Sequence, residues 1–160
     1  MTNEVRPGNS AFLDEVDAIL TQTDEEALFG GLGEMLVAIC DLDLAYEQQI
    51  GPTYTARRHR DWGGKRLVAL RYARDMFHVL SRAVNPAVGR ALTVEGPRSV
   101  HGELVWKPVL QIPGMEWYEF PERLSVYRNY LHGERVRETL QGVAEFLEMI
   151  EREHPDLRRV

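Results

Sequence analysis

The stretch from Leu28 to Tyr46 reads LFGGLGEMLVAICDLDLAY, and it decides the fold class. Its large apolar side chains recur in alternating steps of four and three residues, which is the period of one face of an α-helix. This stripe consists of Leu28, Leu32, Met35, Ile39, Leu42 and Tyr46. Thr23 and Glu26 have the spacing of a capping box just before the stripe. We therefore expect a long helix over about residues 24–48, with one face in the core.

Similar patterns predict further helices over residues 10–20, from residue 61 or 65 to 84, and over 121–132 and 134–153. Residues 51–64 are expected to form a connection, because glycines and a proline punctuate that stretch. Around residues 91–113, glycines and prolines interrupt short β-prone runs, which predicts a short extended or β-hairpin insert. The sequence thus predicts a mainly α protein, a bundle of about four to five helices with a small hairpin insert.

The 160 residues suit one domain, which we expect over residues 10–155 after a disordered N-terminus over residues 1–9. Cys40 is the single cysteine and lies in an apolar helical stretch, which indicates a buried thiol in a reducing compartment. We find no apolar segment typical of a secretory signal or a membrane span, so a cytoplasmic protein without a membrane partner is expected. The histidines lack partners at metal-binding spacing, so neither a metal nor another cofactor is predicted.

The charges are distributed unevenly along the chain. Met1–Ile50 contains one basic residue, Arg6, against eleven acidic ones, whereas Arg57–Arg74 contains seven basic residues against one acid, Asp61. A basic cluster of this kind is typical of a nucleic-acid contact. The alternative is that the acidic and basic helices pack against each other or face a partner subunit, and on general grounds this alternative is favoured.

The polar face of the helix predicted up to residue 84 carries the candidate chemistry. On a helical wheel its polar arc contains Arg71, Arg74, Asp75, His78, Ser81 and Arg82. Imidazole can act as a base near pH 7, and guanidinium groups suit the charge of a phosphate undergoing attack. We therefore predict Arg74, His78 and Arg71 as candidate catalytic residues for metal-independent RNA cleavage. The alternative is a solvated face on which Asp75 pairs with a neighbouring arginine.

The stretch Leu70–His78, LRYARDMFH, resembles the signature helix of HEPN-type domains. The wider likeness covers about residues 25–150 and includes Trp106–Pro108, Tyr127–Leu131 and Val136–Leu140. It points to short HEPN-like proteins of high-GC bacteria and their phages. The resemblance implies a small, usually dimeric helical bundle that acts in conflict or regulation, with metal-independent ribonuclease activity in some members. It thus implies a homodimer, with RNA or a protein as further partners.

The match to the HEPN motif is imperfect in its spacing. The motif has an arginine, often a polar second residue, and a histidine after four to six intervening residues. Arg74 is followed by the polar Asp75, but only three residues separate Arg74 from His78. Arg71 has six intervening residues before His78, but Tyr72 occupies the polar second position. The alternative function is therefore a non-catalytic protein-interaction or dimerisation module with a degenerate motif.

The basic stretch before this helix is a second candidate site. We predict Arg57, Arg58 and Arg60, together with Arg82, as RNA-binding residues, because guanidinium groups contact phosphates. Tyr54 and Trp62 are available for base stacking. The alternative is that the stretch is simply a solvated connection, which is common for short charged clusters.

Overall fold

The computed structural model describes residues 9–22, 24–83, 94–95, 105–106 and 121–157, and over residues 75–83 it describes the helical backbone but not the side chains. Six helices occur in these ranges, and the predicted mainly α bundle is confirmed. They are α1 (Asn9–Leu20), α2 (Glu25–Ile50), α3 (Pro52–Arg60), α4 (Trp62–Ala83), α6 (Pro121–Tyr130) and α7 (Val136–Glu153). Disorder was expected for residues 1–9. Residues 1–8 lie outside the described residues, and Asn9 begins α1.

Helix α3 corrects one expectation, since it lies in the stretch that was predicted to be a connection. Gly51 adopts φ 81°, a left-handed conformation that suits glycine and ends α2. Pro52 follows at the first position of α3, where its missing N–H costs nothing. Asp61 alone then separates α3 from α4, and its carboxylate accepts the N–H of Gly63 at 2.9 Å. Gly51 and Pro52 therefore mark the place where α2 ends and α3 begins without an intervening loop.

Helix α2 begins one residue later than the proposed capping box would require. Asp24 is its N-cap, and the Asp24 side chain accepts the backbone N–H of Ala27 at 3.1 Å. Thr23 lies outside the described residues. The predicted apolar stripe of α2 faces the core: Leu42 is partly buried, and Leu28, Leu32, Met35, Ile39 and Tyr46 are buried.

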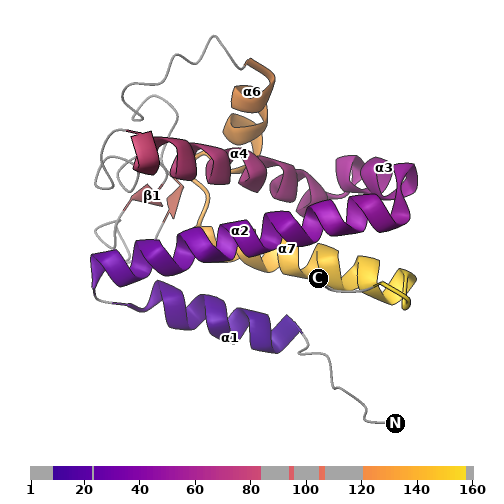
Figure 1. Ribbon diagram of the computed structural model, residues 1–160, viewed down its shortest axis with the longest axis horizontal. Coiled ribbons are helices and arrows are strands. Elements are labelled where there is room, and N and C mark those ends of the chain that lie inside the picture. The colour runs from indigo at the N-terminus through magenta and orange to yellow at the C-terminus, as the bar shows by residue number, and fades with distance from the viewer. Residues whose placement is uncertain (1–8, 23, 84–93, 96–104, 107–120, 158–160) are drawn as a thin grey trace.

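Helix α4 is central to the packing of the bundle (Figure 1). It contacts α2, α3, α6 and α7, while α1 packs against α2 and α7 on the opposite side of α2 from α4. The stripe expected on α7 is also buried, and consists of Val136, Leu140, Val143, Leu147 and Ile150. Because α4 touches four other helices, side chains on several of its faces contribute to the interior, and none of its residues from Gly63 to Arg74 is exposed.

The predicted hairpin is present as a short antiparallel pair, β1 (Val94–Glu95) and β2 (Val105–Trp106), with Val94 opposite Trp106. Trp106 is fully buried, and its indole N–H donates to the hydroxyl of Thr139 at 3.1 Å. Its backbone also bonds to Glu134 and Gly133 in the turn between α6 and α7. Trp106 therefore closes over the core, whereas the nearby aromatic residues Trp117, Tyr118 and Phe120 lie outside the described residues.

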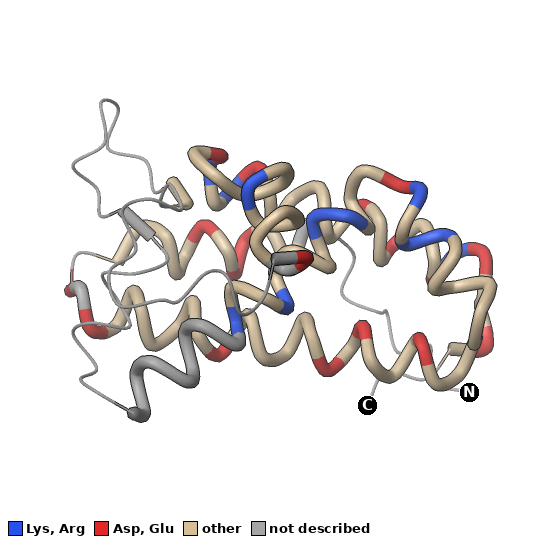
Figure 2. The backbone as a smooth tube through the Cα atoms, turned by 90° about the horizontal axis from the view of Figure 1, so that it is seen from above, with Lys and Arg blue, Asp and Glu red and all other residues tan. Residues whose placement is uncertain are grey.

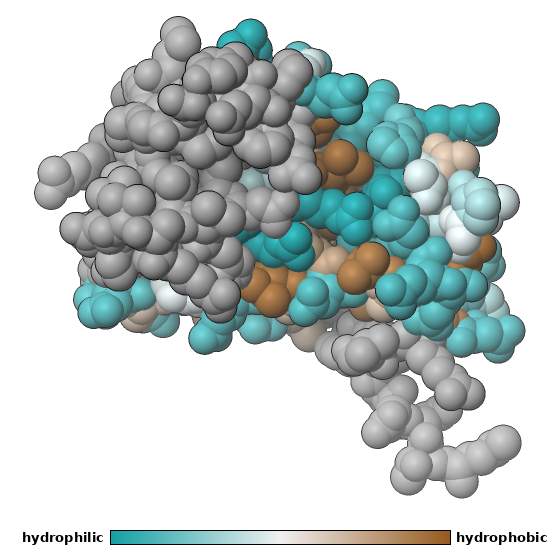
Figure 3. All heavy atoms as spheres, turned by 45° about the horizontal axis from the view of Figure 1, so that its top comes forward, coloured by the Kyte–Doolittle hydropathy of each residue, from teal (hydrophilic) through white to brown (hydrophobic). Residues whose placement is uncertain are grey.

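Apolar side chains reach the surface in separate places among polar ones on the face shown in Figure 3. Among the residues whose burial the structure describes, the exposed large apolar side chains are Leu44, at 45%, and Trp62, at 53%. Within the described ranges, no helix has an apolar run of the length that a bilayer crossing requires.

Candidate functional site

The acidic and basic residues that are separated along the sequence contact each other between helices. Helix α2 carries acidic residues and no Lys or Arg, whereas α3 carries Arg57, Arg58 and Arg60 and no acid. Figure 2 shows the acidic residues in red and the basic ones in blue along the backbone. Basic side chains of α3 and α4 meet carboxylates of α2, so the expectation that acidic and basic helices pack together is confirmed for the residues described next.

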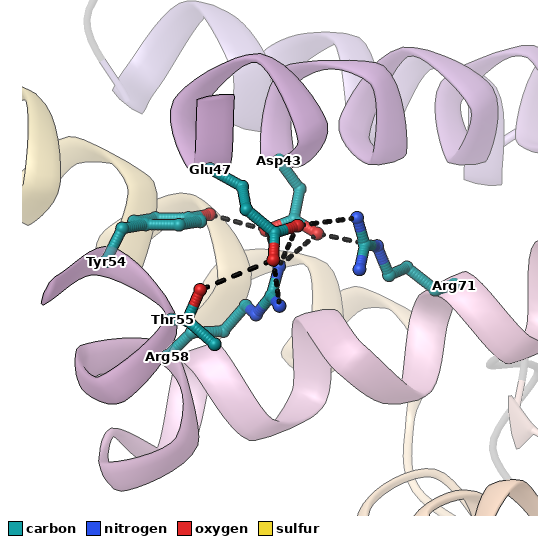
Figure 4. A network of polar contacts seen from close by, with 6 residues as sticks. All are labelled: Asp43, Glu47, Tyr54, Thr55, Arg58 and Arg71. Atoms are coloured by element: carbon teal, nitrogen blue, oxygen red, sulfur yellow. Dashed lines mark hydrogen bonds and ion pairs between the residues drawn. The ribbon is translucent and has the colours of Figure 1, made fainter. Parts of the chain in front are cut away.

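Asp43 lies at the centre of this network and is fully buried (Figure 4). Arg58 on α3 donates from Nη1 to both of its carboxylate oxygens at 2.8 Å. The Tyr54 hydroxyl donates to Oδ1 at 2.5 Å, and Nε of Arg71 on α4 lies 2.7 Å from Oδ2. One carboxylate of α2 therefore ties α3 and α4 together. A buried charge requires partners of this quality, because an unpaired one would be costly.

Glu47 extends the network toward solvent, one helical turn after Asp43. Its carboxylate accepts from Nη2 of Arg71 at 3.3 Å and from the hydroxyl of Thr55 at 3.3 Å, and it pairs with Nη2 of Arg58 at 3.4 Å. Burial raises the pKa of Glu47, but the positive charges of Arg58 and Arg71 outweigh it, so the net pKa lies below the ordinary value. Glu47 is therefore held as a carboxylate that orients both arginines.

Burial also shifts the pKa values of Tyr54 and Arg58, two other members of the network. Burial raises the pKa of the Tyr54 hydroxyl, and the adjacent Asp43 carboxylate raises it further, so Tyr54 stays protonated and donates. Burial lowers the pKa of Arg58, but its hydrogen bonds and ion pair with Asp43 more than compensate, and the net pKa is raised. Both groups therefore keep the protonation states that the network needs.

This arrangement changes the expectation for Arg58. The sequence offered two alternatives for Arg58, contact with RNA or a place in a solvated connection, whereas the structure leaves only 4% of its side chain exposed. Contact with an RNA phosphate is no longer expected of Arg58, because its guanidinium is buried against Asp43. Arg57 and Arg60 are exposed on the same helix, and Arg57 pairs with Glu153 at 3.1 Å. Tyr54 is likewise buried and unavailable for base stacking, while Trp62 is exposed.

A surface pocket of about 450 Å³ opens beside the network, where α2, α3, α4 and α6 meet. Arg71 and Arg74 of α4 both line it, so the structure brings together two of the three candidate catalytic residues. His59 of α3 and Glu122 of α6 also line it, and neither was predicted as a site residue. Among the described residues, the pocket is also lined by Cys40, Leu44, Val68, Tyr72 and Val126. Cys40 is buried, as expected.

Arg71 connects the network with the pocket. Its contacts with Asp43 and Glu47 use Nε and Nη2, and neither contact uses Nη1. The side chain is 30% exposed, so it is anchored at one edge and still reaches the pocket surface. A guanidinium held in this way loses little conformational freedom when it binds an anion.

His78 and Arg82 lie further along α4, and their side chains are outside what the structure describes. On an α-helix, His78 is one turn beyond Arg74, on the same face. Their predicted roles as catalytic base and RNA contact therefore stay predictions. Over the described part of the chain, His, Cys, Asp and Glu side chains do not gather in any group of three or more suited to a metal ion.

Lowering the pH is expected to weaken the network at Glu47. Because the pKa of Glu47 is lower in the folded protein than its ordinary value, its carboxylate contributes stability above that ordinary value. This contribution is lost as the pH falls through the folded-state pKa. Urea unfolding of wild type and Glu47→Gln at pH 7 and at pH 3 measures it. The stability gap between the two proteins should narrow at pH 3, and an unchanged gap would contradict this account.

Fold and site together define a mainly helical bundle with an internal Asp–Arg network and an adjoining pocket lined by two arginines. Comparisons with protein-family models, curated proteins and solved structures give no match. The HEPN-like assignment therefore rests on the sequence resemblance alone, and the functional argument depends on the geometry of this pocket.

Proposed function

We propose that this protein is an RNA-binding helical domain of HEPN-like type, with the Arg71–Arg74 pocket as its phosphate site. The observation that carries the proposal is that Arg71 and Arg74 line the same open pocket while Asp43 and Glu47 hold Arg71 in place. Guanidinium groups bind phosphate through paired hydrogen bonds, and an oriented guanidinium binds with less entropic cost. The exposed Arg57 and Arg60 on α3 are further candidates for backbone contact.

As an enzyme, the protein would cleave RNA without a metal. His78 would take the proton from a 2′-hydroxyl, whose oxygen then attacks the adjacent phosphorus. The bond from phosphorus to the 5′-oxygen breaks, that oxygen takes up a proton, and a 2′,3′-cyclic phosphate remains. Arg71 and Arg74 would stabilise the negative charge that builds up on the phosphate.

RNA binding and cleavage by the purified protein, with and without EDTA, test this proposal. Arg74→Ala is expected to weaken RNA binding and to reduce the slope of log affinity against log salt by about one. His78→Ala should keep binding but lose at least about a hundredfold in cleavage rate. The matched control is Arg152→Ala, an exposed arginine on α7 away from the pocket. Equal RNA affinity of wild type, Arg74→Ala and Arg152→Ala would refute the phosphate site.

A second candidate is a non-catalytic interaction or dimerisation module. It is favoured by the pairing of Arg71 with Asp43 and Glu47, which gives this motif residue a structural role. Trp62 offers a contact surface, because it is exposed, its ring lies 5.3 Å from that of Tyr130, and the guanidinium of Arg66 lies 5.2 Å from the Trp62 ring centre. Intact RNA after incubation, together with a dimer by light scattering that Trp62→Ala dissociates, would favour this function over cleavage.

A further inference from the structure

The pocket has two chemically different sides. Leu44 on α2 and Val68 on α4 form an apolar wall, and Arg71 and Arg74, also on α4, supply guanidinium groups. Leu44 is 45% exposed, so its side chain is accessible to a ligand in the pocket. A ligand that satisfies both sides must carry an apolar or aromatic body next to a negative charge.

We propose that the pocket holds a single unstacked nucleotide of single-stranded RNA, with its base against Leu44 and Val68 and its phosphate on Arg71 and Arg74. This inference rests on the proposed RNA-binding function and names the form of RNA that the site accepts. The volume of about 450 Å³ falls within the range of small-ligand sites, which is about 300–1,000 Å³. Inorganic phosphate alone would leave the apolar wall in contact with water.

The fixed position of Arg71 determines where the phosphate goes. Because Asp43 and Glu47 hold the Nε edge of Arg71, its donors cannot swing away to follow an anion elsewhere. Glu122 on α6 adds a carboxylate to the pocket lining, and this charge would repel a phosphate placed beside it. The guanidinium groups of Arg71 and Arg74 therefore accept the phosphate, and the base is directed to the apolar wall.

Duplex RNA does not meet these requirements. Its bases are paired and stacked, so none can enter a pocket, and its backbone can contact the guanidinium groups only from outside. Single-stranded RNA can turn one base out of the stack at little cost and place it on an apolar surface. The pocket is thus expected to discriminate between the two forms, which exposed arginines alone would not do.

The test compares the affinity of fluorescent single-stranded RNA with that of a duplex of the same sequence, by anisotropy. We expect the single strand to bind at least about fivefold more tightly than the duplex. Leu44→Ser should remove most of this preference, and Arg74→Ala should weaken both forms. Val37→Ser, a partly buried residue of the same helix outside the pocket, is the control, and thermal melting checks that all variants fold.

Competition experiments identify the ligand chemistry. A nucleoside monophosphate should displace the single strand better than either the nucleoside or inorganic phosphate. Equal affinity for single strand and duplex, both lowered by Arg74→Ala, would overturn this inference and leave the RNA-binding function intact. Equal competition by inorganic phosphate and the nucleoside monophosphate would also overturn it. Absence of binding to both RNAs would instead refute the proposed function.

Discussion

Replacing Asp43 with Ala is expected to lower the free energy of unfolding by about 3–5 kcal/mol, because the buried charge of Arg58 loses its closest partner and keeps only the longer contact with Glu47. Arg58 would keep its buried position with both of its 2.8 Å hydrogen bonds to Asp43 removed. The Tyr54 hydroxyl would also lose its acceptor inside the protein. Urea unfolding followed by circular dichroism measures the difference.

Asp41→Ala is the matched control, because Asp41 lies on the same helix and is exposed. Its effect should stay within about 0.5 kcal/mol, as for most surface substitutions. A loss for Asp43→Ala no larger than that of Asp41→Ala would show that the network contributes nothing to stability.

The double variant Asp43→Leu with Arg58→Met separates two explanations of such a loss. Well-packed apolar replacements for both partners of a buried ion pair are often neutral or stabilising. The double variant should therefore recover the part of the loss that comes from the unpaired Arg58, while Tyr54 and Arg71 still lack their contacts with Asp43. If it is as unstable as Asp43→Ala, the loss comes from disturbed packing of α2 against α3 and not from the unpaired charge.

Gly63→Ala is expected to destabilise the protein by about 1–3 kcal/mol, because α4 and α7 cross with no room for a methyl group. A Cβ at Gly63 would lie 2.3 Å from the carbonyl oxygen of Gly142 and 2.8 Å from the Cβ of Phe146. Both obstacles belong to or adjoin the backbone of α7, so neither can rotate aside. Thermal melting of the variant should show the loss directly.

Gly30→Ala is the opposite control for this crossing. Gly30 lies inside α2, and apart from its own helix backbone no atom of the described residues lies within 4 Å of the position of its added Cβ. Alanine is favoured over glycine in a helix interior by about 0.5–1 kcal/mol, so this variant should be more stable than wild type. If both variants shift the stability in the same direction and by the same amount, the close contact of α4 with α7 at Gly63 is not the cause of the change in Gly63→Ala.

The helices could be predicted from the sequence because their signals are local. The apolar stripes of α2 and α7 repeat within each helix, and each stripe is buried in the structure. Helix α3 was missed since nine residues with two turn signals at their start do not show a clear apolar period. The neighbours Tyr54 and Arg58 on α3 are buried four residues apart, but a tyrosine and an arginine do not form an apolar pattern.

The candidate site was only partly predictable. Arg71 and Arg74 lie on one helix, so their proximity follows from helical geometry, and both line the pocket. His59 and Glu122 reach the same pocket from α3 and α6, and residues so far apart in sequence carry no local signal of meeting. The exposed Leu44 also gives no sequence signal, because an apolar residue in a helix is normally expected to be buried.

The sequence by itself determined that this protein is mainly helical and that Arg71, Arg74 and His78 share one face of a helix, since both properties depend on spacing within a single element. Only the tertiary structure decided which arginines are internal and which line the pocket. Arg58 is buried and Arg71 is anchored because Asp43 and Glu47 approach them from another helix. Whether a charge is buried or solvated depends on such long-range partners, and the spacing of residues in the chain does not contain that information.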